Sequence, residues 1–200
     1  MKILLTLFVL LFSSSLFAEN ITDYEIEGMS VGDSLLDYFS EAEIMNSIRL
    51  DGYIGSDGKF SDVTFLDHPT FKIYEGMQIA FKTDDKKFKI YAIMGTIFFG
   101  KNINDCFLKL KEVDKDLLKI FKTNDNQDYP IREEYPLTKY PGQDTSFEKT
   151  IAYYLNNTND SVDIVCYDMD NEKFDMQDYF QLGINTSEYV NWVVDYQSTK

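Results

Sequence analysis

The two cysteines constrain the fold most, because each occupies an apolar position in a different kind of element. Cys106 lies on an apolar stripe with helical spacing. Cys166 alternates with Val162 and Ile164 in the segment VDIVCYD, a pattern that predicts the inward face of a strand. We therefore expect both side chains to meet in one core and form a disulfide bond between helix and sheet. On chain-entropy grounds, a crosslink closing a loop of this length stabilises a fold by about 4 kcal/mol.

The N-terminal stretch MKILLTLFVLLFSSSLFAEN has the layout of a secretory signal peptide. Lys2 supplies the positive charge, residues 3–12 form an apolar run broken only by Thr6, and three serines lead toward Ala18. The run is shorter than the roughly 20 apolar residues that a membrane-spanning helix needs. We therefore expect removal of residues 1–18, export to the periplasm or secretion, and no membrane insertion after cleavage.

The composition describes an acidic, core-forming chain. It has 19 basic and 34 acidic residues, and loss of Lys2 with the signal peptide leaves 18 against 34, a net charge of −16. This charge opposes binding to nucleic acid or anionic lipid, because both need basic surface. The 16 Phe and 14 Tyr residues supply ample core material. We expect one domain over residues 19–200, with 22–100 and 101–200 as possible subdomains.

The N-terminal half predicts a helix followed by strands. In GMSVGDSLLDYFSEAEIMNSI, Ser30 is positioned to cap a helix, and Asp33 follows at the spacing of a capping box. Residues 51–69 are rich in Gly, Asp and Ser and indicate turns, with a short strand at 63–66. Residues 71–99 alternate in two runs joined by DDKK, which predicts a β-hairpin.

The segment INDCFLKLKEVDKDLLKIF gives the clearest helical pattern, and we expect a helix over about 104–122 with its Cys106 face on the sheet. Residues 123–146 carry three of the four prolines and predict a long surface connection.

The C-terminal part returns to strands. FEKTIAYYL and VDIVCYD flank a polar turn and predict a second hairpin, YFQLGINT predicts a third strand, and Ser187 is expected to cap a last helix. The order favours an α+β fold: two antiparallel β-hairpin or sheet units, each preceded by an amphipathic helix, with a C-terminal helix.

A cluster of acidic residues follows Cys166 and could form a metal loop or a catalytic carboxylate group. Its members are Asp168, Asp170, Glu172, Asp175 and Asp178. Counting from Asp168, the sixth and twelfth positions hold Lys173 and Tyr179, where an EF-hand loop needs Gly and Glu. We expect a solvated turn, with a non-standard Ca²⁺ loop as the alternative.

Other site chemistries lack their residue types. Two cysteines and one histidine supply too few ligands for a zinc site. The single histidine, His68, precedes Pro69 in a turn, where we expect an exposed side chain with no catalytic role. The sequence therefore predicts no catalytic, cofactor-binding or metal-ligating residue.

The segment YEIEGMSVGDSLLDYF resembles the start of small exported bacterial α+β modules of the BamE and β-lactamase-inhibitor-protein kind. The resemblance covers the Gly-x-Ser turn, the capped helix and the order of elements after a signal peptide. The lipid-attachment cysteine of BamE proteins is missing here, and no functional residue carries over. The resemblance implies a small exported module of the α+β class.

These observations favour an exported, periplasmic, non-catalytic protein that binds an unidentified protein or small molecule or associates with the cell envelope. The alternatives are a small Asp/Glu-dependent hydrolase and a divalent-cation-binding protein. Two carboxylates facing each other across a cleft would favour the hydrolase. A sheet face carrying Tyr and Phe side chains would favour the binding protein.

Overall fold

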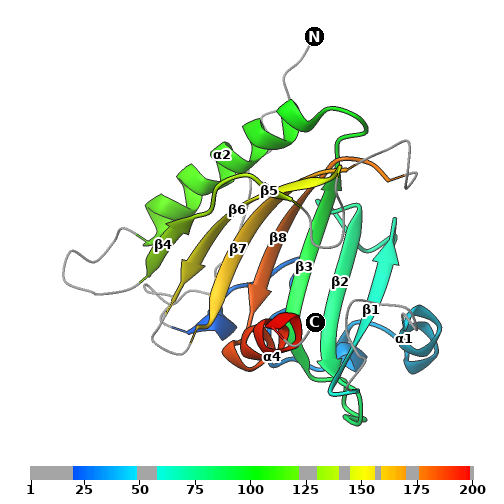
Figure 1. Ribbon diagram of the computed structural model, residues 1–200. Coiled ribbons are helices and arrows are strands. Elements are labelled where there is room, and N and C mark those ends of the chain that lie inside the picture. The colour runs from blue at the N-terminus through cyan, green and yellow to red at the C-terminus, as the bar shows by residue number, and fades with distance from the viewer. Residues whose placement is uncertain are drawn as a thin grey trace.

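The computed structural model describes residues 20–48, 58–121, 130–139, 145–155, 159–169 and 176–198. Its centre is one eight-stranded antiparallel sheet in the order β1-β2-β3-β8-β7-β6-β4, with β5 also pairing with β6 (Figure 1). The strands are β1 (Phe60–Leu66), β2 (Gly76–Lys82), β3 (Ile90–Phe98), β4 (Ile131–Glu134), β5 (Thr138–Lys139), β6 (Phe147–Tyr154), β7 (Ser161–Asp168) and β8 (Tyr179–Asn185).

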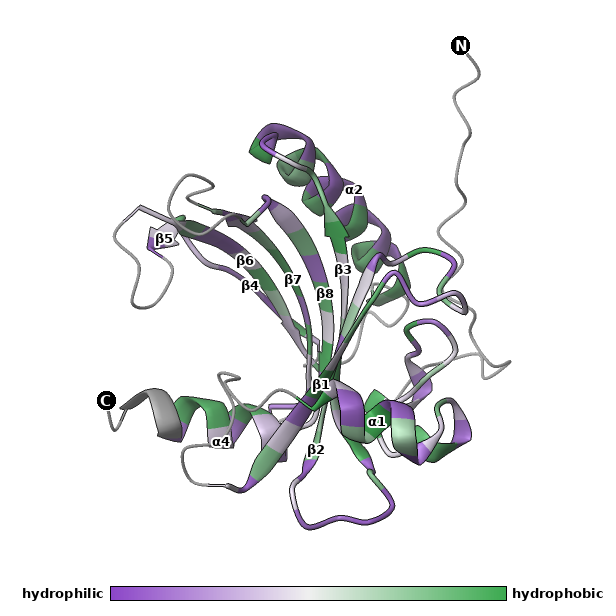
Figure 2. Ribbon diagram, turned by 90° about the vertical axis from the view of Figure 1, so that its right-hand side faces the viewer, coloured by the Kyte–Doolittle hydropathy of each residue, from purple (hydrophilic) through white to green (hydrophobic). Residues whose placement is uncertain are grey.

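Helices lie on both sides of this sheet. They are α1 (Glu41–Ser47), α2 (Ile103–Phe121) and α4 (Ser187–Ser198), together with the short 3₁₀ helices η1 (Ile21–Asp23) and η2 (Leu35–Asp37). Helix α2 covers one face, and α4 lies on the opposite side, toward which strands β4, β6, β7 and β8 bend (Figure 2). Within the described residues, no helix combines the length and apolar character needed to cross a membrane.

The expected fold class is wrong, because the two predicted strand units form one continuous sheet. Strands β3 and β8 pair along their length, from Ala92 opposite Asn185 to Phe98 opposite Tyr179. The chain runs through β1, β2 and β3, crosses by α2 to the far edge at β4, and returns through β6, β7 and β8. Pairing β3 with β8 removes two exposed strand edges, which a pair of separate hairpins would leave unpaired.

The segment predicted to be a surface connection also contributes to the sheet. Strands β4 and β5 lie within residues 123–146 and pair with β6. Only 130–139 and 145–146 of this stretch are among the described residues. Both strands are too short to give a periodic pattern in the sequence, and β4 reads IREE, a polar run typical of a sheet edge.

The first helix begins later than the sequence predicts. The Ser30 N–H donates to Asp33 Oδ2 at 2.9 Å, yet no α-helix follows directly. Instead the Leu35 N–H donates to the Phe88 carbonyl oxygen, so a contact with the segment before β3 fixes the backbone there. Ser34 caps only the short 3₁₀ helix η2, and helix α1 starts after Ser40, which forms a complete capping box.

Helix α2 and its disulfide bond agree with the sequence. Cys106 and Cys166 are joined with their Cα atoms 5.9 Å apart, which confirms the predicted link between helix and sheet. The apolar stripe of α2 packs on β7 and β8. Its fully buried members besides the cysteine are Leu110, Val113 and Leu117.

A polar contact anchors the C-terminal half of α2 to the sheet edge. The Asp114 carboxylate accepts hydrogen bonds from Arg132 Nε at 2.8 Å and from the Tyr153 hydroxyl at 2.5 Å. Burial alone would raise the pKa of Asp114, but the bonds from Arg132 and Tyr153 lower it below its usual value. Asp114 therefore joins α2 to β4 and β6 and is accounted for by this structural role.

The N-terminal segment is bonded to residues 72–74 before β2, and Tyr74 of that stretch packs on β3. The Glu27 carboxylate accepts backbone N–H groups of Lys72, Ile73 and Tyr74 at 2.7–3.0 Å. The Tyr74 ring packs directly on Gly95, where an added Cβ would lie 2.6 Å from a ring carbon. Ile73 is 39% exposed, and its backbone N–H is bonded to Glu27 before β2 begins.

Candidate functional site

The sheet face that carries α4 is far more polar than the face beneath α2. Side chains of one face form rows across the strands, because antiparallel partners project to the same side. One such row runs from β1 to β7, with each residue opposite the next in the pairing register. Its members are Thr64, Gln78, Met94, Gly183 and Asp163. This row mixes polar groups with a glycine, which leaves a hollow on the sheet surface.

Helix α4 covers one end of this face through an aromatic cluster. Tyr189 and Trp192 pack on Phe60 of β1, with ring centroids 5.5 Å and 5.1 Å away. Ala80 and Ala92 lie beneath them and are fully buried, and their small side chains leave room for the large rings. The helix is therefore fixed over β1, β2 and β3, and its other side faces the hollow.

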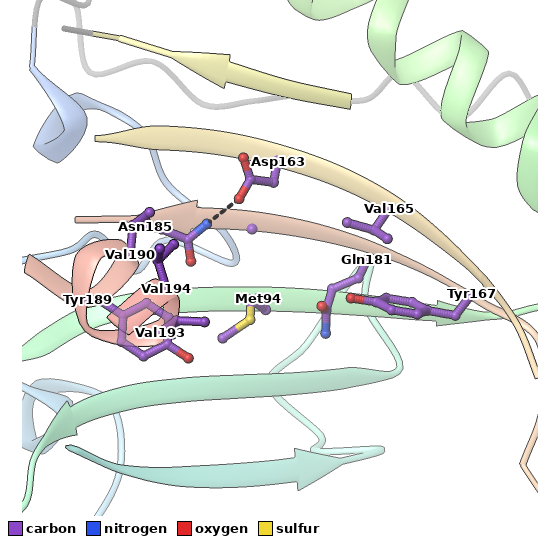
Figure 3. A pocket seen from close by; sticks show the side chains of 11 residues that line it. Met94, Asp163, Val165, Tyr167, Gln181, Asn185, Tyr189, Val190, Val193 and Val194 are labelled. Carbon is purple, nitrogen blue, oxygen red and sulfur yellow. Dashed lines mark hydrogen bonds between the residues drawn. The ribbon is translucent and has the colours of Figure 1, made fainter. Parts of the chain in front are cut away.

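A pocket of about 260 Å³ lies between α4 and the sheet (Figure 3). The lining residues come from α4 and from three adjacent strands, β3, β8 and β7. They are Met94, Asp163, Val165, Tyr167, Gln181, Gly183, Asn185, Tyr189, Val190, Val193 and Val194. Gly183 is part of the floor, where an added Cβ would lie 3.2 Å from Asn185 Nδ2 and 3.3 Å from Met94 Cγ.

Asp163 is the acidic residue of this pocket. Its Oδ2 accepts hydrogen bonds from Asn185 Nδ2 at 2.9 Å and from the Ser161 hydroxyl at 3.3 Å. Its Oδ1 is buried and has no hydrogen-bond partner among the described residues. Burial raises the pKa of Asp163 to about 7, although the bonds from Ser161 and Asn185 act in the opposite direction. A buried carboxyl group with one oxygen left without a hydrogen bond lowers the stability of the folded protein.

Two amide side chains complete the polar part of the pocket. Since Asn185 directs its Nδ2 at Asp163, its carbonyl Oδ1 is the acceptor that it offers (Figure 3). Gln181 Nε2 lies 3.5 Å from Thr96 Oγ1, a contact that turns the amino end of Gln181 toward β3. Each amide therefore spends one of its two N–H donors on the protein, while its carbonyl oxygen is an acceptor available to a ligand.

Aromatic side chains continue the face beyond the pocket. Tyr167, which lines the pocket, stacks on Tyr179 with ring centroids 4.4 Å apart. Tyr179 in turn contacts Phe98 at 6.2 Å. All three are half-buried, so part of each ring is accessible on this side of the sheet.

The predicted acidic cluster is only partly described. Asp170, Glu172 and Asp175 lie outside the described residues. Asp178 is buried, not solvated, and its Oδ1 accepts the Met169 N–H at 3.0 Å, which ties the end of β7 to the start of β8.

Asp168 lies beside Asp178, and its pKa is raised, first by burial and then by that neighbouring charge. In the part of the chain that the structure describes, no group of three or more His, Cys, Asp or Glu side chains could hold a metal ion.

His68 is half-buried, contrary to the exposed position that the sequence predicts. Its ring packs among Phe39, Phe65 and Phe71, with centroids 5.2–5.8 Å away, and its Nε2 lies 3.8 Å from a Glu43 carboxylate oxygen. It is not among the residues that line the pocket. These contacts connect α1 to the loop after β1, and the absence of a catalytic role stays a prediction.

The sequence prediction missed the pocket residues Asp163, Gly183 and Asn185. In VDIVCYD, Asp163 lies between apolar residues of a predicted strand. Other parts of the fold can cover such a position, and an acidic residue that becomes buried is an informative signal. Gly183 interrupts an apolar strand in the same way, and such a glycine often marks close approach of a ligand or another backbone. Neither signal indicates that the two residues are neighbours.

Comparison of the chain with protein-family models, with curated proteins and with solved structures found no match.

Proposed function

We propose that this protein is an exported, non-catalytic binding protein that holds a small molecule in the pocket between α4 and the sheet. The observation that carries the proposal is the buried Asp163 Oδ1, which has no partner among the described residues. Native proteins satisfy nearly all buried polar atoms, and a costly exception in a concave site is typical of a group kept for a ligand.

The size and lining of the pocket agree with this proposal. Sites for drug-sized ligands have volumes of roughly 300–1,000 Å³, combining apolar walls with a few placed polar groups. The pocket, at about 260 Å³, is slightly smaller and has the same composition: valines of α4 and β7 and Met94 surround Asp163, Asn185 and Gln181. A ligand smaller than a typical drug molecule fits it.

Export is supported by the sequence of residues 1–18, which lie outside the described residues, and by the disulfide bond. Disulfide bonds persist in oxidising compartments such as the periplasm and are rare in the reducing cytosol. The Cys106–Cys166 bond is buried between α2 and β7, so it belongs to the folded core. A chain exported before folding would form it in the periplasm or outside the cell.

The hydrolase alternative has less support. Two-carboxylate glycoside hydrolysis needs an acid and a second carboxylate about 5–10 Å apart across the bound sugar. Asp163 is the one acidic residue among those lining the described pocket. The accessible Tyr167 and Tyr179 rings on the same face favour binding instead.

An NMR titration with benzyl alcohol tests the pocket. The probe combines an apolar ring with one hydroxyl group and is small enough for the cavity. We expect amide shifts concentrated at Gln181, Asn185 and Val190. Gly183→Val should abolish them by filling the floor.

Gly76→Val is the matched control, since Gly76 lies on the same sheet face and a Cβ there would meet Leu66 and Thr96 outside the pocket. Shifts scattered over the surface, or unchanged in Gly183→Val, would contradict the proposal. If Gly183→Val fails to fold, Gly183→Ala should still weaken binding several-fold relative to Gly76→Ala.

A further inference from the structure

The pocket offers acceptors and negative charge and lacks a positive counterpart. Asp163 presents a carboxyl group, and Asn185 and Gln181 present carbonyl oxygens because their amino groups are directed at the protein. Neither lysine nor arginine occurs among the lining residues that the structure describes. A ligand that brings hydrogen-bond donors and a positive charge therefore complements the pocket.

We propose that the ligand of this pocket is a small organic cation, an ammonium group on an apolar body, with the Asp163 carboxylate as its counter-charge. The inference rests on the proposed binding function and specifies its ligand class. The Asp163 side chain lines the pocket, and its Oδ1 has no hydrogen-bond partner among the described residues. An ammonium N–H can then donate to the carboxylate, and a second can donate to Asn185 Oδ1.

The apolar lining accommodates the rest of such a ligand. Val190, Val193 and Val194 form the wall on α4, and Val165 and Met94 lie across from them on the sheet (Figure 3). Tyrosine rings at both ends, Tyr167 and Tyr189, add faces that attract cations. The pocket thus joins one charged end to an apolar cavity.

The same features of the pocket disfavour anionic and neutral ligands. An anion would face Asp163 with no basic side chain to offset the repulsion. A neutral alcohol can donate one hydrogen bond to Asp163 but leaves the charge of the carboxylate uncompensated. The pocket should therefore rank a cation above an alcohol and an alcohol above an anion of the same chain length.

Titration with three six-carbon probes tests this order at pH 8: n-hexylamine, which is protonated at this pH, 1-hexanol and hexanoate. We expect hexylammonium to bind at least ten-fold more tightly than hexanol by NMR shifts at Gln181 and Asn185, and hexanoate to cause no shifts there. Asp163→Asn should remove the preference for hexylammonium while hexanol binding remains. Asp116→Asn, which removes the same charge from α2 on the opposite face, should preserve the preference.

The outcomes separate the two proposals. Binding of hexanol and hexylammonium with equal affinity, or a preference that survives in Asp163→Asn, would overturn the cation inference and leave the binding function standing. No localised shift with any probe, including benzyl alcohol, would overturn both. An equal loss of preference in Asp116→Asn and Asp163→Asn would show that overall negative charge attracts the amine, and would also refute the role of Asp163.

Discussion

Asp163→Asn should stabilise the protein at pH 8, and the stabilisation should shrink as the pH falls. Burial raises the pKa of Asp163 from 3.8 to about 7, so between these values the folded chain holds a proton that the unfolded chain has lost. The contribution of Asp163 to the free energy of unfolding is therefore largest below about pH 4 and is lost as the pH rises through about 7. Asparagine carries no charge and removes this dependence.

The magnitude follows from the size of the shift. A difference of about three pKa units corresponds to at most about 4 kcal/mol above pH 7. From pH 5 to pH 7 the folded wild-type protein binds about one proton more than the unfolded chain. The free energy of unfolding of Asp163→Asn, relative to wild type, should therefore increase by about 3 kcal/mol between pH 5 and pH 8. Asparagine can keep the bond from Asn185 Nδ2 through its own carbonyl oxygen, so the pocket contact is preserved.

Urea unfolding of both proteins at pH 5, 6, 7 and 8 measures this difference. Asp116→Asn serves as the control, since its side chain lies on the exposed side of α2 in a surface ion pair with Lys119. We expect it to change the free energy of unfolding by less than about 1 kcal/mol at every pH. A parallel pH dependence of wild type and Asp163→Asn, or a variant less stable than wild type at pH 8, would refute the reasoning.

Three further predictions concern the fold and its export. Leu110→Asp should lower the free energy of unfolding by more than about 3 kcal/mol, because it buries a charge beneath α2. Lys111→Asp, on the exposed side of α2, should change it by about 0.5 kcal/mol or less. Equal melting temperatures of the two variants in thermal unfolding would contradict the orientation of α2. Replacing Cys106 and Cys166 by alanine should lower stability by about 2–5 kcal/mol in urea unfolding, and two free thiols in the native protein by non-reducing mass analysis would refute the bond. N-terminal sequencing of exported protein should start at Glu19, and an intact Met1 would refute cleavage.

Local sequence patterns predicted the elements whose environment is simple. The stripe of α2 is apolar on one side only, and its helix and disulfide bond were correct in position and orientation. β6 and β7 were predicted as a hairpin and β8 as a third strand, because their apolar residues are flanked by polar turns. Leu110 and Cys166 lie on the faces that the periodicity indicates.

Non-local contacts decided what the sequence did not predict. The pairing of β3 with β8 joins residues about 90 positions apart, and no local pattern encodes which strand edges meet. The segment after Ser30 has a capping signal, but it forms only the short 3₁₀ helix η2, where the Leu35 N–H donates to the Phe88 carbonyl oxygen. Tertiary contacts override weak helix propensity in such segments.

The pocket depends on the same non-local pairing. Asp163 and Gly183 face each other only because β7 and β8 adopt this register, and Met94 joins them only because β3 pairs with β8. Helix α4 then closes one side. A polar residue in the middle of an apolar strand was visible in the sequence, but its burial without a full set of hydrogen bonds was not.

The most direct test of the account is a ¹³C NMR titration of the Asp163 carboxyl carbon, with and without n-hexylamine. The account predicts a pKa of about 7 in the free protein, raised by burial in the pocket, and a lower pKa when hexylammonium is bound, because the cation stabilises the carboxylate. Asp163→Asn identifies the signal by its loss. A pKa near 4 in the free protein would show that Asp163 is not a buried carboxyl kept for a ligand, and a pKa unmoved by saturating hexylammonium would contradict the cation as its partner.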